Sequence, residues 1–156
     1  MSEFHLGTRS TERLEQVHPD LQRVIKRAIT ITTVDFTILE GLRSAERQKE
    51  LVKHGASKTL DSRHLTGHAV DLGAVVGGQV RWDWPLYYDI ASAVVRASFA
   101  EGIPVRWGGC WDKMASQLDA NDIEAEVSAY VARQKRAGLK AFIDGPHFEL
   151  PKKDYP

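Results

Sequence analysis

The sequence is nearly free of cysteine, since Cys110 is the only one in 156 residues. A single thiol cannot close an internal disulfide, so the fold does not depend on oxidation. A disulfide-stapled secreted scaffold is therefore excluded, and so is a structural zinc site built from several cysteines.

Long apolar runs are also missing. The first thirteen residues carry charges at Glu3, Arg9 and Glu12 and contain no apolar stretch long enough for a signal peptide. No later segment approaches the roughly 18 to 20 consecutive apolar residues of a membrane span. We therefore expect neither a signal peptide nor stable membrane insertion.

The chain has no excess charge of either sign, because 21 basic and 21 acidic residues balance to a net charge of +0. Long-range attraction to nucleic acid or to an anionic membrane surface is then lacking. The basic residues also form no stripe with interleaved aromatics. We expect no nucleic-acid partner.

Internal repeats and low-complexity linkers are absent, so no domain boundary is indicated. The composition is that of an ordinary soluble globular protein, with 42% hydrophobic and 27% charged residues. A chain of this length is able to bury most of its apolar surface in one core. We expect a single domain over residues 1–156.

The first half of the chain predicts a helix, a strand and a second helix. Residues 18–20 (His-Pro-Asp) open the first helix, because proline is tolerated in a first turn. Its apolar residues have the spacing of one helix face: Leu21, Val24, Ile25 and Ala28. Residues 36–40 are rich in β-forming side chains and end at Gly41, which predicts a strand. Arg43 then lies in the turn before a helix over residues 44–55.

The middle of the chain predicts a hairpin and a third helix. Residues 69–76 read as a strand that returns through a two-glycine turn at Gly77-Gly78 to residues 79–82. A helix follows over residues 85–102, and residues 104–107 predict a short strand.

The last third predicts one more helix and a final strand. Between Asp119 and Lys140 the acidic residues precede the basic ones, an order that a helix dipole favours. The apolar positions mark its buried face: Ile123, Val127, Tyr130 and Val131. Gly138 ends this helix before a strand over residues 141–150. Because no βαβ rhythm repeats, we expect an α+β fold with a small antiparallel sheet flanked by helices.

Potential metal ligands are concentrated in two segments, residues 62–71 and residues 144–149. A catalytic zinc ion needs three protein ligands, typically histidine nitrogens and a carboxylate oxygen, with a fourth position left open. His64, Asp71 and His147 supply such a set. Each segment alone also has an ordinary structural interpretation, a core histidine or an aspartate in a turn, so the residues by themselves leave both possibilities open.

A competing ligand pair is His64 with His68, at the i, i+4 spacing of a zincin helix. The glutamate that such a helix needs after its first histidine is replaced by Leu65, and Gly67 disfavours a helix there. We expect His68 to support the site or to have a structural role.

The spacing Ser62-x-His64-x-x-Gly67-x-Ala69-x-Asp71 resembles the SxHxxGxAxD signature of the zinc D-alanyl-D-alanine peptidase family. That family also includes phage endolysins that cut the L-alanyl-D-glutamate bond. The resemblance extends over most of the chain, to residues 17–21, 41–44, 48, 107–109 and 144–148. It implies a fold like that of hedgehog-type and D-alanyl-D-alanine peptidase domains.

The resemblance also implies the roles of individual residues. One zinc ion would be bound by His64, Asp71 and His147. Asp144 would be the general base, three residues before a ligand, and Arg43 would support the substrate or the developing oxyanion. Substrate-binding roles are implied for three further residues: Gln48, Ser62 and Trp107.

The function implied is that of a monomeric endolysin that hydrolyses the L-alanyl-D-glutamate bond in the stem peptide of bacterial peptidoglycan and so causes host lysis. It would wait in the host cytoplasm until released to the cell wall, and it would have no separate wall-binding domain. The alternatives are a D-alanyl-D-alanine carboxypeptidase or dipeptidase, and a non-catalytic metal-binding module. An intact Asp144 speaks against the last of these.

Two features depart from the family pattern. Cys110 occupies a place where related endolysins often have an acidic residue, and we expect it to be a small buried packing residue. Residues 112–143 form an insert that shapes the substrate groove or caps the fold.

Overall fold

The computed structural model describes residues 2–156 and builds them around one antiparallel sheet of five short strands. The strands are β1 Asp35–Glu40, β2 Ala69–Val76, β3 Gln79–Arg81, β4 Arg106–Trp107 and β5 His147–Glu149. Their order is β1-β2-β5-β4, and β3 pairs with the last residues of β2 as a hairpin. The expected α+β class is confirmed.

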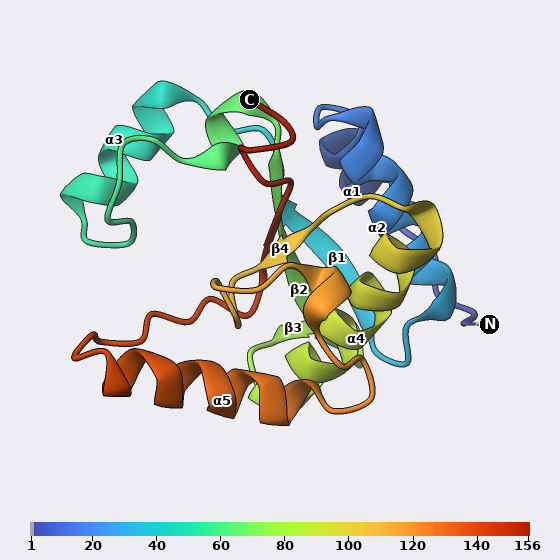
Figure 1. Cartoon of the computed structure of the whole chain (residues 1–156). Coiled ribbons are helices and arrows are strands. Elements are labelled where there is room, and N and C mark those ends of the chain that lie inside the picture. Colours follow the sequence, from blue (N-terminus) through green and yellow to red (C-terminus); the bar gives the residue numbers. More distant parts are fainter. Residues whose placement is uncertain (1) are drawn as a thin grey trace.

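The helices flank this sheet on two sides (Figure 1). They are α1 Thr8–Leu14, α2 Pro19–Ile31, α3 Ala45–Lys53, α4 Trp84–Glu101 and α5 Ile123–Arg136, with single 3-10 turns η1 Arg63–Thr66 and η2 Ala115–Gln117. In the view of Figure 1, α1, α2 and α4 lie to one side of the sheet, whereas α3 and α5 project to the other. The hydrophobic core fills the space between the sheet and the packed pair α2 and α4.

The helices predicted from the sequence are confirmed, and capping sets their first residues. α2 begins at Pro19, where His18 Nδ1 accepts a hydrogen bond of 3.0 Å from the backbone N–H of Asp20. Its predicted apolar face is completely buried: Leu21, Val24, Ile25 and Ala28. α3 begins after Ser44, whose hydroxyl accepts a 3.1 Å hydrogen bond from the N–H of Arg47.

The final strand is the largest error of the sequence prediction. Only His147–Glu149 pairs with neighbours, and residues 141–146 form a loop instead of the expected strand. The neighbouring strands run alongside for only a few residues, Ala69–Asp71 on one side and Arg106–Trp107 on the other. Pro146 also lacks an N–H group to donate to a ladder. The loop is thereby free to form one wall of the functional site.

Smaller differences concern the ends and faces of elements. The strand expected over residues 104–107 is shortened to Arg106–Trp107, and Val131 is 37% exposed although its spacing suggested burial. α1 was not predicted, because Leu14 is the only apolar side chain that it buries and no helical periodicity results. Among residues 2–156, no helix combines the length and the apolar character that crossing a membrane requires.

Candidate active site

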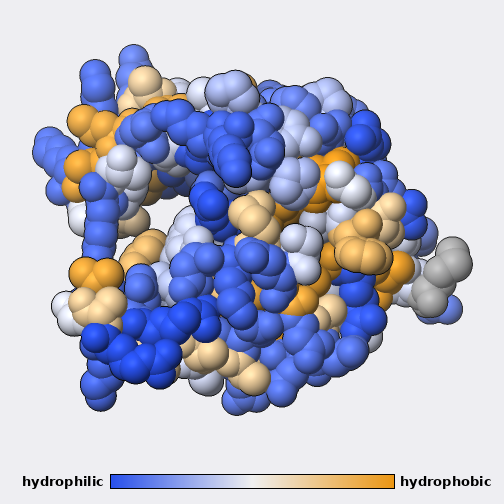
Figure 2. Space-filling view, viewed as in Figure 1, coloured by the Kyte–Doolittle hydropathy of each residue, from blue (hydrophilic) through white to orange (hydrophobic). Residues whose placement is uncertain are grey.

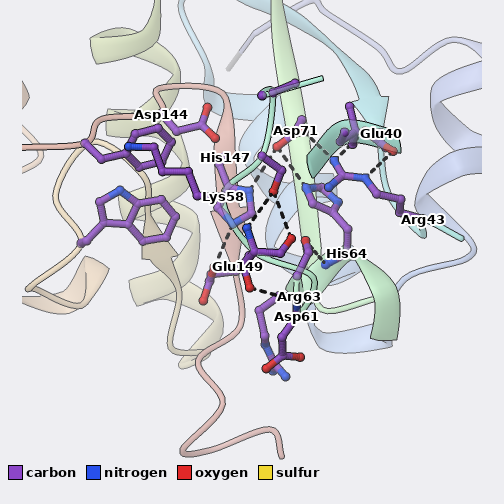
Figure 3. A pocket seen from close by; sticks show the side chains of 18 residues that line it. Glu40, Arg43, Lys58, Asp61, Arg63, His64, Asp71, Asp144, His147 and Glu149 are labelled. Carbon is purple, nitrogen blue, oxygen red and sulfur yellow. Dashed lines mark hydrogen bonds and ion pairs between the residues drawn. The ribbon is translucent and has the colours of Figure 1, made fainter. Parts of the chain in front are cut away.

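A cleft of about 640 Å³ opens between the loop that follows α3 and the loop that precedes β5. Both ligand-rich segments of the sequence line it. Figure 2 shows the molecule hollowed at this place, on the left of the view, with hydrophilic and hydrophobic residues around the opening. Figure 3 shows the polar side chains that gather in the cleft.

His64 lies on the 3-10 turn η1, which the sequence specifies at both ends. The hydroxyl of Ser62 accepts a 3.2 Å hydrogen bond from the N–H of His64, and Gly67 ends the turn with a φ of 73°. His64 is 2% exposed, and its Nδ1 lies 2.8 Å from the carbonyl oxygen of Gly41. Because a carbonyl only accepts, Nδ1 carries the proton, and Nε2 is left free to face Asp71 at 3.2 Å.

Asp71 and His147 come from neighbouring strands and are paired directly in the ladder between β2 and β5. His147 Nδ1 lies 3.2 Å from the same carboxylate oxygen of Asp71 that faces His64. One ligand atom from each of the three residues lies within 4.8 Å of the others. Two imidazole nitrogens and one carboxylate oxygen at this spacing fit a divalent ion such as zinc.

The pKa values of this cluster reflect its close packing. Burial alone would raise the pKa of Asp71, but its close contacts with the imidazoles of His147 and His64 hold it well below its usual range. Burial would lower the pKa of His147, but its bonds to Asp71 and Glu149 raise it to about 9. Without a metal ion, His147 therefore holds an extra proton near neutral pH, and metal binding would release that proton.

Arg43 lies in the turn after β1, as predicted, and is fixed by an extensive set of contacts. Its Nε and one terminal nitrogen each donate to Glu40 at 2.7 Å, and the other terminal nitrogen donates to Gln48 at 2.7 Å. The side chain is 8% exposed and lies 3.7 Å from Asp71. The pair with Glu40 is therefore present, and it holds the guanidinium beside the ligand cluster, facing the cleft.

Gln48 does not contact the cleft, contrary to the substrate-binding role implied by the resemblance. It is completely buried, accepts from Arg43, and donates to Ser57 and to the carbonyl of Thr59. Its role is to join Arg43 to the loop that forms one wall of the cleft.

Asp144 lies in the loop before β5, which the Trp-Gly-Gly segment holds in place. The N–H of Asp144 donates to Gly108 at 2.8 Å, and the N–H of Gly108 donates to His147 at 2.9 Å. A Cβ at Gly108 would lie only 2.2 Å from the carbonyl oxygen of Asp144, so only glycine fits there. Burial and then the nearby charge of Asp71 raise the pKa of Asp144, which faces the cleft.

Trp107 lies behind the site and does not line the cleft, so its predicted contact with substrate is not supported. It is 1% exposed, and its indole N–H donates to the carbonyl of Gly145 at 2.7 Å. Trp111 takes the place on the cleft wall instead, with its ring 5.3 Å from that of His147. The sequence pattern did not distinguish these two tryptophans.

Cys110 is completely buried beside Trp111, which confirms the packing role expected for it. Burial and then Asp112 raise the pKa of the thiol to about 11, so it stays protonated and unreactive near neutral pH.

His68 is not brought into the ligand cluster. Its ring stacks on His18 at 5.6 Å, and its Nδ1 lies 2.6 Å from the hydroxyl of Thr66. The structure therefore gives no support to the competing His64 and His68 pair, and it supports the structural role expected for His68.

Glu149 also lies in the site, although no role was predicted for it from the sequence. Its carboxylate lines the cleft and lies 2.8 Å from His147 Nε2. Two residues after His147 in a strand, it necessarily shares the same face, and that spacing was the available signal.

A cleft with two histidines and an aspartate at its floor, beside a further carboxylate, is the arrangement of a hydrolytic site. The model of the family described as phage L-alanyl-D-glutamate peptidase matches residues 1–151. The chain belongs to this family, and the resemblance drawn from its motifs is confirmed.

Individual relatives agree with this assignment. The chain is 32% identical to the L-alanyl-D-glutamate peptidase of Escherichia phage T5 over 120 residues, which are 74% of this chain and 88% of that protein. It is 35% identical to the L-alanyl-D-glutamate peptidase of Listeria phage A118 over 78 residues, 50% of this chain and 27% of the relative.

The solved structure of the L-Ala D-Glu endopeptidase ChiX of Serratia marcescens is similar over nearly the full chain. Its TM-score is 0.76 at 44% identity, and the match covers 99% of this chain and 96% of that one.

Proposed function

We propose that this chain is a zinc-dependent endopeptidase that hydrolyses the L-alanyl-D-glutamate bond of the peptidoglycan stem peptide. The main support is that ligand atoms of His64, Asp71 and His147 lie within 4.8 Å of one another at the floor of the cleft. Asp144 faces the same cleft. The proposed substrate rests on family membership and on the names of the relatives.

His64, Asp71 and His147 would hold one zinc ion, because their donor set is the one that catalytic zinc sites use. When bound, zinc supplies a Lewis acid that polarises a carbonyl group and lowers the pKa of water towards about 7. The cleft leaves the cluster accessible on one side, where a substrate and a water molecule would enter.

Asp144 is the proposed general base. Its raised pKa makes it a better proton acceptor than an ordinary surface aspartate. It would take a proton from the attacking water and pass it to the amine nitrogen of the departing D-glutamate. The bond that breaks is the amide, and the products are an alanyl carboxylate and a free amine.

Arg43 is proposed to stabilise the negative charge that develops on the carbonyl oxygen of the scissile bond. Its contacts with Glu40 and Gln48 fix the guanidinium before the substrate arrives, so little reorganisation is needed during reaction. Ser62 and Trp111 line the cleft and are proposed to contact the stem peptide.

At the scale of the cell, we propose a monomeric, single-domain endolysin that stays in the host cytoplasm until it is released to the wall and lyses the host. The phage relatives support this placement.

The test is mass spectrometry of the soluble products from purified protein and Gram-negative sacculi. Stem peptides that begin with D-glutamate, lost with a chelator and in Asp144→Ala, are the expected result. Free D-alanine as the only product would assign a carboxypeptidase instead. If no product depended on the chelator, the zinc proposal would be wrong.

A further inference from the structure

We propose that Glu149 is a positioning residue that fixes the ring of His147 so that Nδ1, and not Nε2, binds the metal ion. This inference rests on the proposed zinc site and adds a determinant of metal affinity to it.

The two histidines of the cluster present different nitrogens to the same point. His64 turns Nε2 towards Asp71, whereas His147 turns Nδ1 towards it, and both atoms lie 3.2 Å from one carboxylate oxygen. Each ring therefore has to be neutral in the opposite tautomer when metal is bound. The free histidine side chain does not by itself enforce such a choice, so the protein has to supply it.

The outer hydrogen-bond partners of the two rings supply this choice. The carbonyl of Gly41 accepts from His64 Nδ1 at 2.8 Å, and the carboxylate of Glu149 accepts from His147 Nε2 at 2.8 Å. Both partners lack a proton to donate, so each ring keeps its proton on the nitrogen that faces away from the metal. Glu149 also carries a negative charge, which makes the imidazole a stronger ligand than a carbonyl partner would.

The backbone around Glu149 makes its position rigid. Glu149 pairs with Ala69 of β2 on one side and with Arg106 of β4 on the other. The residue is 9% exposed, and its strand places it on the same face as His147. The carboxylate is thus held at a fixed distance from the ring and has little room to turn towards solvent.

The test measures metal binding directly and does not depend on turnover. Zinc affinity of the metal-free protein is determined by competition with a chromophoric chelator for wild type, Glu149→Gln and Glu149→Ala. The visible spectrum of the cobalt-loaded protein reports the ligand geometry of each variant. Glu101→Gln is the matched control, because Glu101 is a similarly shielded carboxylate that pairs with Arg27 between α4 and α2.

We expect Glu149→Ala to weaken zinc binding by about 10- to 100-fold and to change the cobalt spectrum. Glu149→Gln should lose less, because an amide oxygen still accepts from Nε2 although the charge is gone. The control should bind zinc like wild type.

Wild-type affinity and an unchanged cobalt spectrum in Glu149→Ala would overturn the inference while leaving the zinc site intact. A wild-type protein that binds no zinc would instead overturn the proposed function itself. If Glu149→Ala does not fold, as judged by circular dichroism, Glu149→Gln decides: unchanged affinity and spectrum there reject the role of the charge.

Discussion

At the scale of single residues, Arg43 combines an observed ion pair with Glu40 and a proposed role in catalysis. Its contacts with Glu40 leave it fully charged and nearly buried, 3.7 Å from Asp71. A surface ion pair would contribute only about 0 to 1 kcal/mol, but a charge fixed in a cleft acts on whatever reacts there.

Arg43→Ala should therefore lower kcat on isolated stem peptides by about 100- to 1000-fold, because one preorganised charge donor is lost. The measurement is steady-state kinetics, with circular dichroism to show that the variant folds. Arg47→Ala is the control, since Arg47 is an exposed arginine in the nearby first turn of α3 and does not line the cleft. Near-normal kcat in Arg43→Ala would show that Arg43 has only a structural role, as the partner of Glu40.

The titration of His147 predicts that the free energy of unfolding depends on pH in opposite directions with and without a bound metal ion. In the metal-free fold its pKa is raised to about 9, against about 6.5 in an unfolded chain, so the folded state holds the extra proton between these values. The free energy of unfolding should then fall as pH rises from about 6.5 through about 9. With zinc bound the ring must be neutral, so stability should rise with pH up to about 6.5 and then level off.

Thermal unfolding across pH 5 to 10, with chelator and with zinc, measures this difference. His147→Gln in chelator should lose the downward slope between about pH 6.5 and 9. A metal-free wild-type protein whose melting temperature stayed constant over that range would contradict the assigned coupling between His147 and its two carboxylates.

At the scale of elements, the loop before β5 matters more than the strand predicted in its place. The turn after β4 holds this loop through backbone hydrogen bonds from Asp144 to Gly108 and from Gly108 to His147. The Trp-Gly-Gly motif thus determines the position of the proposed base without any side chain of its own in the cleft.

Gly108→Ala should displace the loop that carries Asp144, because the alanine Cβ would lie only 2.2 Å from the carbonyl oxygen of Asp144. We expect a loss of stability of about 1 to 3 kcal/mol and a larger loss of kcat. Melting temperature and peptide hydrolysis measure the two effects. Gly7→Ala is the control, since a Cβ there has nothing within 4 Å. Unchanged kcat in Gly108→Ala would show that the loop tolerates the shift.

At the scale of the whole molecule, residues 112–143, the expected insert, contribute Phe142 to the wall of the cleft. Arg133 of α5 pairs with Asp112 at 2.7 Å and so ties the helix to the segment that carries Trp111. Phe142, near the end of the insert, stacks on Trp111 with ring centroids 6.4 Å apart. Lys58 from the opposite wall lies 5.1 Å from the Phe142 ring, so the two walls meet across the cleft.

Removal of this contact should affect substrate binding more than chemistry. We expect Phe142→Ala to raise KM about two- to fivefold with little change in kcat, because an exposed cation-aromatic contact and one apolar wall contribute on the order of 1 kcal/mol. Steady-state kinetics on stem peptides separate the two constants. Phe99→Ala is the control, as Phe99 is 79% exposed on α4 and does not line the cleft. A drop in kcat alone would point to a catalytic effect instead.

Much of the fold and site was predictable because the signals are local. Caps at His18 and Ser44 and a glycine after α4 act within a few residues, so the helix positions followed from the sequence. Turn η1 is likewise defined by Ser62 and Gly67, which explains why the motif around His64 is readable as a pattern.

The sequence by itself determined which side chains could bind a metal ion and on which elements they lie. Only the tertiary structure decided which of them meet: the ladder between β2 and β5 joins His147 to Asp71 across 76 positions of sequence, and leaves His68 outside. The same packing places Trp111 on the cleft wall, where Trp107 was predicted, and brings Glu149 into contact with His147. Spacing along a chain fixes the face of an element, whereas contact between distant elements depends on strand register and on the shape of the common core.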